Sequence, residues 1–581
     1  MRICGALLLL MWLVGLTRAE DWIDSPMYRI PDFKEPVEPL SFPDKLLPLW
    51  LRALERPEVD LRSRAAATIA LAQRRGMKGL NAAIAPLRAL IERNGEHPTV
   101  YLGAARSLIE LDARQTADAL FARAKAGDLA LRELIEPALA RWGHSPSKEE
   151  WLQRLDAPQV GLAMQTLAIR CLTQVHDDRA VDRLGRLLDN PLTPLAVRLE
   201  AARGLGQLRD QGLLDQARRL ASQAGSAAIP ARIAACRLLR RHSDAESVKL
   251  LQQLLRDPEP TVAGLAGERL LQLDAQLLAS EIDRLGSSAD PRLRTLAVQT
   301  LARLPAPPLS KLADALADLH PEVRITARKE LHRLSALKDR RAEVIAQAMR
   351  QLAGTAWQSQ EQATILLVQL DHKPATARLL ELLPTDRSEA FLIAAWGLRK
   401  LAVPDSLPGV VRFVEEELTR MQQNKQSAQR KQMPLHVDLQ LAQLNQLLGA
   451  QKYRPAEKVL RRLLPRLDGL ILHETRAAAF WAMGLLLDGS KDAALAGLAA
   501  ERLRDVSSLP PEDTRVRWMA ALLIGRLKAN EELETLRKFA TTQDWVGQAC
   551  WWSIERISGE KPPPQVVYDQ TVRDWFLAPT E

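Results

Sequence analysis

Aromatic residues and cysteines are scarce in this sequence. Of the 581 residues, 4% are Phe, Trp or Tyr, and four are cysteine. So few rings do not fill the core of a typical β-sandwich or barrel, and four cysteines do not make a disulfide-dense scaffold. The chain is nevertheless 47% hydrophobic and 26% charged. This is the composition of a folded protein and excludes a disordered chain.

The local signatures of common catalytic and metal sites are also missing. The sequence has no His-Glu-x-x-His, Cys-x-x-Cys-His or Gly-x-Ser-x-Gly string and no Gly-rich phosphate loop, and its nine histidines are scattered singly. Ser-x-x-Lys strings occur at 145–148 and 335–338, without the partner motifs of the enzymes that use them. The sequence therefore predicts a protein that is not an enzyme and that binds no metal ion or cofactor.

Long hydrophobic runs are absent except at the N-terminus. A short basic start precedes an almost unbroken apolar run over 3–16, and Thr17-Arg18-Ala19 is typical of a signal cleavage site. The run is short for a bilayer span, which needs about 20 residues. We therefore predict a cleaved signal peptide over 1–19 rather than an uncleaved anchor. We expect an exported protein of a bacterial envelope, periplasmic or extracellular, with no transmembrane segment after cleavage.

The charge of the chain is unevenly distributed. The formal net charge of +9 becomes +7 without the signal peptide, because Arg2 and Arg18 are lost with no acid. Residues 20–44 hold seven acids and two bases, a net charge of −5, which leaves +12 on the rest. For an exported basic protein we expect acidic proteins or anionic envelope polymers as partners, and no nucleic acid.

An acidic, proline-rich lead over 20–45 precedes the basic body. Trp22, Tyr28 and Phe33 are available for packing, and five prolines lower the entropy cost of ordering the segment. We expect the lead to lie across basic surface of the body rather than to hang free.

One pattern recurs along the rest of the chain. In 197–206 an Arg is followed by small residues three and four positions on and by an apolar residue seven positions on, and 231–239 repeats the pattern. On a helix these positions fall within about 100° of one another, so they form one buried stripe in which alanines allow close helix approach. We call the position of this Arg the anchor.

In the middle of the chain the anchor recurs at intervals of about 30 to 34 residues. This period accommodates two short helices and two turns, so each unit is a helical hairpin and the array is a solenoid. The predicted anchors are Arg62, Tyr101, Arg132, Met164, Arg198, Arg232, Ala263, Arg294, Arg324, Gln360, Phe391, Asp438, Arg476, Arg517 and Val546.

Three strings resemble the HEAT-repeat family, specifically its short-unit, phycobilisome-lyase-like subtype: Val-Arg-x-x-Ala-Ala-x-x-Leu-Gly at 197–206, and similar strings at 323–327 and 516–521. The resemblance covers about 46–560. It implies an all-α fold, a right-handed α-solenoid of about 13–16 stacked hairpins, with an insertion at about 415–435. HEAT-like arrays include scaffolds, transport receptors, chromophore lyases and DNA glycosylases, so the resemblance predicts the architecture and not the function.

A proline-rich tail over 561–581 follows the predicted solenoid. Three prolines end the last helix and hold the chain extended before Tyr568, Trp575 and Phe576. The tail is therefore either a docking peptide for a partner or a strap folded onto its own solenoid.

The resemblance also assigns a role to the anchor arginines. In the family an Arg at this position typically pairs with an Asp of the neighbouring turn and ties one repeat to the next. Asp290 with Arg294, and Asp513 with Arg517, have the local spacing for such pairs. A ligand-binding groove is the alternative. The implied structural ladder consists of Arg198, Arg232, Arg294, Arg324 and Arg517.

The residues five positions after each anchor form a column that is mainly basic in earlier repeats and contains tryptophans in later ones. This position is about 140° round the helix from the anchor, so we expect it to face out of the core toward the inner curve of the solenoid. Exposed Trp and Arg are the residues most frequent in interface hot spots. The predicted partner-binding residues are therefore Arg203, Arg237 and Lys329 in earlier repeats and Trp396, Trp481 and Trp551 in later ones.

Two functions are compatible with these observations. The first is a non-enzymatic, exported scaffold or adaptor that binds a protein or extended peptide on its inner face, with the tryptophans of the C-terminal third as the docking site. The alternative is a binder of an anionic envelope polymer or glycan, which would use the Arg and Trp columns together.

The export prediction has a direct test. If residues 1–19 are a cleaved signal peptide, the mature chain begins at or near Glu20, and N-terminal sequencing of the native protein reads from there. An intact Met1 on a cytoplasmic species would contradict export and would make nucleic acid a candidate partner again.

Overall fold

The computed structural model describes residues 25–29, 31, 42, 46–157, 159–423, 428–432, 434–466, 472–541 and 544–563. All regular structure in these residues is helical. The chain divides into two compact units. The N-terminal unit is Glu38–Leu296, and the C-terminal unit is Ala297–Val566 together with Met1–Val37.

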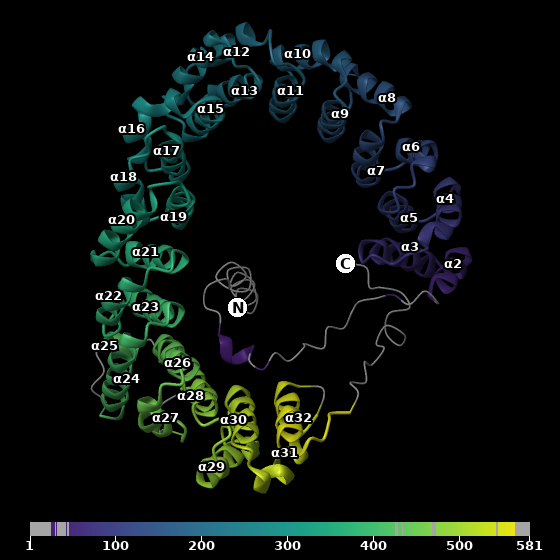
Figure 1. Cartoon of the computed structure of the whole chain (residues 1–581). Coiled ribbons are helices and arrows are strands. Elements are labelled where there is room, and N and C mark those ends of the chain that lie inside the picture. Colours follow the sequence, from purple (N-terminus) through teal and green to yellow (C-terminus); the bar gives the residue numbers. More distant parts are fainter. Residues whose placement is uncertain are drawn as a thin grey trace. The chain divides into compact units, whose positions relative to one another are not determined.

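In each unit, helices alternate between the first and the second helix of a hairpin (Figure 1). The first helices of the N-terminal unit are α2 (Leu47–Glu55), α4 (Ile84–Glu92), α6 (Ala117–Ala126), α8 (Ser145–Asp156), α10 (Val181–Asp189), α12 (Leu214–Ala221), α14 (Ala245–Leu255) and α16 (Ile282–Gly286). The second helices are α3 (Val59–Arg74), α5 (Pro98–Glu110), α7 (Leu129–Trp142), α9 (Leu162–Gln174), α11 (Leu195–Leu208), α13 (Ile229–Leu238), α15 (Pro260–Leu273) and α17 (Pro291–Arg303), which continues into the C-terminal unit.

The C-terminal unit repeats this arrangement. Its first helices are α18 (Leu309–Asp314), α20 (Arg341–Ala353), α22 (Thr376–Leu382), α24 (Leu407–Gln422), α27 (Glu457–Leu463), α29 (Ala493–Arg504) and α31 (Leu533–Phe539). Its second helices are α19 (Pro321–Ser335), α21 (Trp357–Gln369), α23 (Ser388–Leu401), α26 (Pro434–Ala450), α28 (His473–Leu486), α30 (Thr514–Leu527) and α32 (Trp545–Ser558).

Short 3₁₀ helices occupy many of the connections. They are η1 (Pro26–Tyr28), η3 (Leu80–Ala83), η4 (Arg114–Thr116), η5 (Asp178–Ala180), η6 (Ser226–Ala228), η7 (Ala275–Glu281), η8 (Ala315–Ala317), η9 (Lys373–Ala375), η10 (Pro404–Ser406), η11 (Arg454–Ala456) and η12 (Asn530–Glu532).

The predicted α-solenoid is confirmed. The described residues form fifteen such helix pairs, within the predicted 13–16, and every predicted anchor lies near the start of a second helix. Within each unit, successive second helices contact one another as well as the first helix of their own hairpin. A second helix is therefore covered on several sides, which explains why its sequence is rich in small residues.

Close approach of neighbouring second helices requires small side chains. Ala201 and Ala202 on α11 are fully buried. At Gly206, farther along α11, an added Cβ would lie 1.9 Å from the carbonyl oxygen of Arg237 on α13. The glycine therefore permits a helix contact that no side chain fits.

The predicted insertion at 415–435 packs against the C-terminal unit through its short helix α25 (Ala428–Lys431). Arg430 on α25 is buried, and its guanidinium donates to the carbonyl oxygen of Thr385 at 2.7 Å and to Oε1 of Gln440 at 2.9 Å. The first part of the insertion is the C-terminal end of α24.

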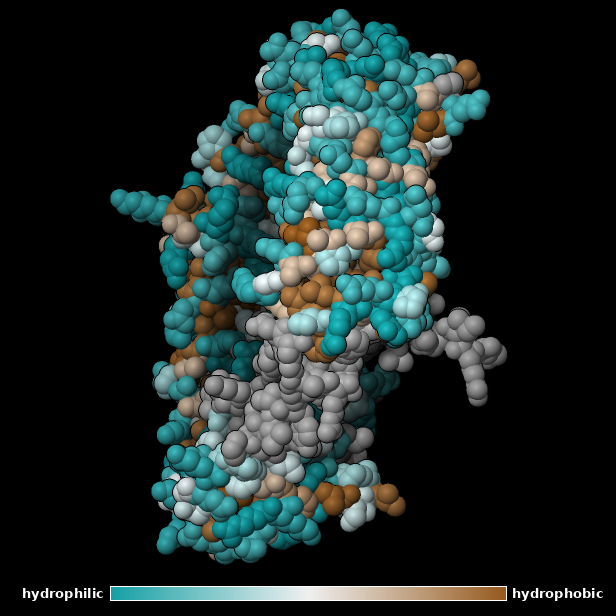
Figure 2. All heavy atoms as spheres, turned by 90° about the vertical axis from the view of Figure 1, so that its right-hand side faces the viewer, coloured by the Kyte–Doolittle hydropathy of each residue, from teal (hydrophilic) through white to brown (hydrophobic). Residues whose placement is uncertain are grey.

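Several predicted features lie outside the described residues: the signal peptide at 1–19, Trp22, Phe33 and the acids of the lead, and the tail after 563. Figure 2 shows one side of the molecule, where hydrophilic side chains cover most of the surface and hydrophobic ones form small separate groups. No helix in the described part of the chain is long and apolar enough to cross a membrane.

Two glycine-to-alanine substitutions in neighbouring helices should differ in their effect on the stability of the protein. Gly206→Ala forces α11 and α13 apart, and we expect it to lower the free energy of unfolding by about 1–3 kcal/mol or more. Gly185 on α10 has open space around its Cβ position, so Gly185→Ala should be neutral or stabilising by up to about 1 kcal/mol. Urea denaturation followed by circular dichroism measures both, and equal midpoints for the two variants would contradict the packing argument.

Candidate partner-binding surface

Arg232 pairs with an Asp of the neighbouring repeat, as the resemblance implies for the anchor arginines. Its Nε donates to Oδ2 of Asp257 at 2.6 Å, and Asp257 belongs to the next hairpin. Its Nη1 also donates to the carbonyl oxygen of Gly225 at 3.0 Å, at the turn of its own hairpin. One buried guanidinium thus ties together two hairpins and a turn.

The other predicted ladder arginines contact mainly their own hairpin. Each donates to carbonyl oxygens at or just after the end of the first helix: Arg198 to Leu188 at 3.1 Å, Arg294 to Ser288 at 2.8 Å, Arg324 to Asp318 at 2.9 Å and Arg517 to Leu503 at 3.0 Å. Arg324 also lies 3.9 Å from Glu361 of the next hairpin. The expected pair of Asp513 with Arg517 is wrong, because the carboxylate of Asp513 binds Arg515 instead.

The predicted basic column is largely engaged within the solenoid. Arg203 on α11 pairs with Glu200 one turn earlier, with Nε 3.0 Å from Oε1. Arg237 on α13 donates to the carbonyl oxygen of Leu199 on α11 at 2.9 Å, and burial lowers its pKa. Lys329 on α19 is exposed. Two of the three side chains are therefore already held by neighbouring groups of the chain.

The expectation that Trp396 and Trp481 face solvent is wrong. Trp396 is 5% exposed and packs in a cluster with Ile365 and Ile393, which come from α21 and α23. Trp481 is 2% exposed and lies over Gly449 of α26, where an added Cβ would be 3.4 Å from the ring. Trp551 on α32 is half-buried. The side chains five positions after the anchor therefore point toward the neighbouring second helix. That helix covers them, although a projection of their own helix alone predicts that they face solvent.

Residues Ser25–Arg29 of the lead occupy a surface formed by the second helices α26, α28 and α30. We call this surface, together with the start of α32, the second-helix face. The hydroxyl of Ser25 donates to Oε1 of Gln446 on α26 at 3.0 Å, and Met27 is fully buried. A short stretch of the chain thus docks on second helices of the C-terminal unit (Figure 1).

Tyr28 makes the most specific contacts of this segment. Its hydroxyl donates to Oε2 of Glu474, at the start of α28, at 2.8 Å. Burial and the adjacent carboxylate of Glu474 raise the pKa of Tyr28 above its usual value, so the phenol keeps the proton that it donates. The ring of Tyr28 lies against Trp518 of α30, with ring centroids 5.3 Å apart.

Glu474 is held in place by charged neighbours. Its Oε1 accepts from Nη1 of Arg515 at 2.6 Å, and Arg515 in turn binds Asp513 through Nε at 2.8 Å and Nη2 at 2.9 Å. Burial opposes ionisation of Asp513, but hydrogen bonds from Arg515 outweigh it and hold the pKa of Asp513 below its usual value. The cluster is therefore two carboxylates sharing one guanidinium.

The backbone at Glu474 is fixed from the neighbouring hairpin. Asp438, at the anchor position of α26, accepts the amides of Glu474 at 3.0 Å and Thr475 at 2.7 Å. It therefore caps the N-terminus of α28 from another helix. Burial raises the pKa of Asp438.

Two tryptophans form the aromatic part of the second-helix face. Trp518 is stacked on Trp545, the first residue of α32, with centroids 5.3 Å apart and ring planes inclined by 14°. The ring of Tyr28 packs against this pair of indoles, with its plane inclined by 35° to that of Trp518, a contact that favours an aromatic side chain. The sequence analysis missed Trp545 and Glu474. The available signal was that Trp518 and Trp545 each lie next to an anchor in successive repeats.

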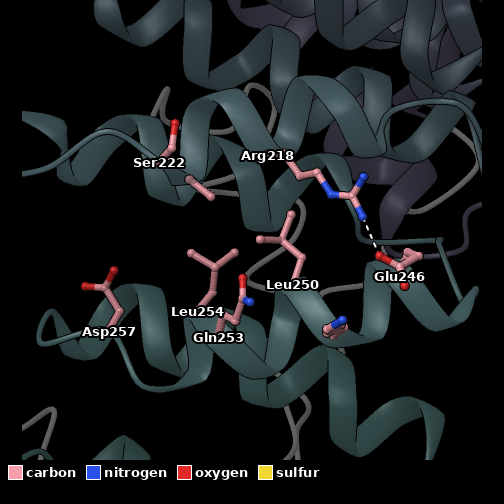
Figure 3. A pocket seen from close by; sticks show the side chains of 9 residues that line it. Arg218, Ser222, Glu246, Leu250, Gln253, Leu254 and Asp257 are labelled. Carbon is pink, nitrogen blue, oxygen red and sulfur yellow. Dashed lines mark hydrogen bonds and ion pairs between the residues drawn. The ribbon is translucent and has the colours of Figure 1, made fainter.

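A groove of about 420 Å³ lies between the first helices α12 and α14 of the N-terminal unit. Leu250 and Leu254 line it, and the ion pair of Arg218 with Glu246, 2.5 Å apart, lies along its edge (Figure 3). Arg218 and Glu246 bind each other and Asp257 binds Arg232, so most of the charge that lines the groove is already paired; the remaining charged residue of the lining is Lys249.

Titratable groups in the described part of the chain do not gather into a metal site. No group of three or more His, Cys, Asp or Glu side chains with suitable placement occurs there. Cys171, Cys236 and Cys550 are buried free thiols, and burial raises the pKa of each.

No protein-family model matches the chain, and no curated protein matches its sequence. A similar solved structure is that of Kap95p, described as inducing the switch loops of RanGDP to adopt the GTP-bound conformation. It is 12% identical, with 88% of this chain and 72% of that chain covered and a TM-score of 0.51. This similarity concerns the fold alone and supports the predicted HEAT-like architecture.

Two further solved structures match with lower TM-scores. Importin beta is 14% identical over 89% of this chain and 82% of its own, with a TM-score of 0.43. Kap121p bound to Pho4p is 12% identical with a TM-score of 0.47, and the match covers 88% of this chain and 57% of that one.

Because Trp481 is buried and Trp551 is half-buried, replacing each by alanine should lower the free energy of unfolding by different amounts. We expect Trp481→Ala to lower the free energy of unfolding by about 3–5 kcal/mol, because it leaves a cavity between α26 and α28. Trp551→Ala removes less buried area and should cost distinctly less. Denaturation followed by circular dichroism measures both variants. A Trp481→Ala variant as stable as the parent would show that Trp481 faces solvent, as the sequence predicted.

Proposed function

We propose that the chain is a non-enzymatic scaffold that binds an extended segment of a protein on the second-helix face of its C-terminal unit. The observation that carries this proposal is the seating of residues Ser25–Arg29 on that face. There, the side chain of Met27 is fully buried, the phenol of Tyr28 binds a carboxylate, and the ring of Tyr28 packs against Trp518. In this proposal the chain's own segment occupies the site that a partner uses.

The physical character of the face supports peptide binding. Its polar groups are fixed in advance by contacts between hairpins, so little freedom is lost when a ligand binds. Trp518 and Trp545 provide large apolar area beside groups that orient a ligand, which is typical of interface hot spots. Kap95p, whose fold is similar, is described as binding RanGDP. Protein binding by this chain is our proposal.

We further propose that the protein is exported and acts in a bacterial envelope, in the periplasm or outside the cell. The apolar run at 3–16 and the small-residue site that ends at Ala19 support this. Membership of the phycobilisome-lyase-like HEAT subtype likewise stays a prediction from the repeat strings.

An anionic envelope polymer as the ligand has less support. Arg203 and Arg237 already bind a carboxylate and a carbonyl group of the chain. Arginines on the first helices are also paired, as in Arg183 with Asp156 at 2.7 Å and Arg461 with Asp492 at 2.5 Å. Much of the positive charge therefore holds hairpins together instead of forming a free cationic stripe.

A peptide-binding experiment tests the proposed function. A fluorescent peptide with the sequence of residues 22–32 is titrated with the full chain and with the full-chain variant Met27→Ser/Tyr28→Ala. The tethered segment competes at an effective concentration in the millimolar range. We therefore expect the variant, in which this competition is weakened, to bind the peptide at least about 10-fold more tightly.

Arg29→Ala is the matched control, because Arg29 is exposed and its backbone amide bonds within the segment, to the carbonyl oxygen of Pro26. This variant should bind the peptide as weakly as the parent chain. No binding by the double variant, or equal binding by all three proteins, would show that the face is not a peptide site.

A further inference from the structure

We infer that the second-helix face selects an unmodified tyrosine, preceded by an apolar residue, in the segment of the partner protein, and that Glu474 is the residue that makes this selection. The inference rests on the proposed function, because it concerns the ligand of the same site. It follows from three features of the contacts around Tyr28: the acceptor, the charge and the ring surface.

The hydrogen-bonding groups at the site leave one acceptor for the ligand. Oε1 of Glu474 accepts from Arg515, and Oε2 accepts from the Tyr28 hydroxyl at 2.8 Å. The guanidinium of Arg515 uses Nε, Nη1 and Nη2 on Asp513 and Glu474. The group that meets the ligand is therefore a carboxylate oxygen, which requires a donor.

A phenylalanine in place of the tyrosine has no donor for this oxygen. The side chain of Glu474 is 13% exposed, so the lost hydrogen bond is only partly replaced by water. A hydrogen bond to a charged group that is left unmade under these conditions lowers affinity by about 10-fold or more. The site therefore distinguishes tyrosine from phenylalanine, although both rings fit the stack.

The charge of the site excludes a phosphorylated or sulfated tyrosine. Glu474 and Asp513 contribute two carboxylates against the guanidinium of Arg515. Nδ1 of His473 lies 3.9 Å from Oδ2 of Asp513. An anionic group on the phenol oxygen would meet Oε2 of Glu474 at hydrogen-bond distance with no proton between them. If Arg515 turned to meet it, Glu474 would lose the hydrogen bond to its Oε1 and Asp513 would lose both of its hydrogen bonds from the guanidinium.

The ring surface and the apolar site before it define the rest of the motif. The ring of Tyr28 lies against Trp518, and Trp518 is itself stacked on Trp545. Met27, the preceding residue, is fully buried, so its position favours an unbranched or branched aliphatic side chain and excludes a charged one. Arg29, the next residue, is exposed and is free to vary.

The test uses the full-chain variant Met27→Ser/Tyr28→Ala and three peptides that cover residues 22–32 and differ only at position 28. They carry tyrosine, phenylalanine or phosphotyrosine. Fluorescence anisotropy should give the tightest binding for the tyrosine peptide, about 10-fold weaker binding for phenylalanine, and still weaker binding for phosphotyrosine.

A second variant assigns the selection to Glu474. Glu474→Gln keeps the size of the side chain and one acceptor oxygen but removes its charge. We expect it to reduce the discrimination against phosphotyrosine by about 10-fold or more. Glu531→Gln, at an exposed glutamate of the same unit, is the matched control and should leave discrimination unchanged. Melting curves confirm that each variant is folded.

The outcomes separate this inference from the proposed function. Equal binding of the three peptides, or discrimination against phosphotyrosine that is undiminished in Glu474→Gln, overturns the tyrosine inference and leaves the peptide-binding scaffold standing. Binding of none of the three peptides overturns both.

Discussion

The close approach of successive second helices is the constraint on which the rest of this structure depends. A short hairpin of two helices has too little apolar area to be stable alone, and each hairpin here is completed by the next. Residues such as Ala201, Ala202 and Gly206 are small because a neighbouring helix lies directly against them. The same contact decides which side chains reach solvent, since a second helix is covered by its own first helix and by its neighbours in the row.

This packing also determines how the chain uses its arginines. Arg232 bridges two hairpins through Asp257, and Arg476 binds Glu512 of the following hairpin through two hydrogen bonds of 2.8 and 2.7 Å. Such bidentate contacts between buried groups fix the register of one repeat on the next. Part of the arginine content of this chain thus holds hairpins together. Around Tyr28 the same kind of network holds Glu474 ready to accept a hydrogen bond from a ligand.

The sequence predicted the features that recur in every repeat. It did not predict those that depend on contacts between the second helices of neighbouring hairpins. The anchors were found because their spacing is regular, and all of them lie on second helices. Trp396 and Trp481 were misplaced because a projection of one helix does not include the helix beside it. The lead was expected to lie on basic surface, whereas its described residues contact Gln446, Glu474 and Trp518. The contact of Ser25 with Gln446 joins residues 421 positions apart, and no periodicity reports such a pairing. Asp438 was a poor match to the anchor pattern, and the structure gives it a different task, the capping of α28.

The central claim is that residues Ser25–Arg29 fill a peptide site on the second-helix face of their own chain. Crosslinking tests it most directly, because Ser25 and Gln446 contact each other at 3.0 Å. A photo-reactive amino acid at position 25 is suitable, because it needs no accessible thiol and Gln446 is 1% exposed. The irradiated chain is digested and analysed by mass spectrometry beside an unirradiated sample. The account predicts a link between positions 25 and 446 within one chain, and loss of binding to an added peptide once the link has formed. Absence of this link, or a linked protein that binds the peptide as well as the unlinked one, would contradict it.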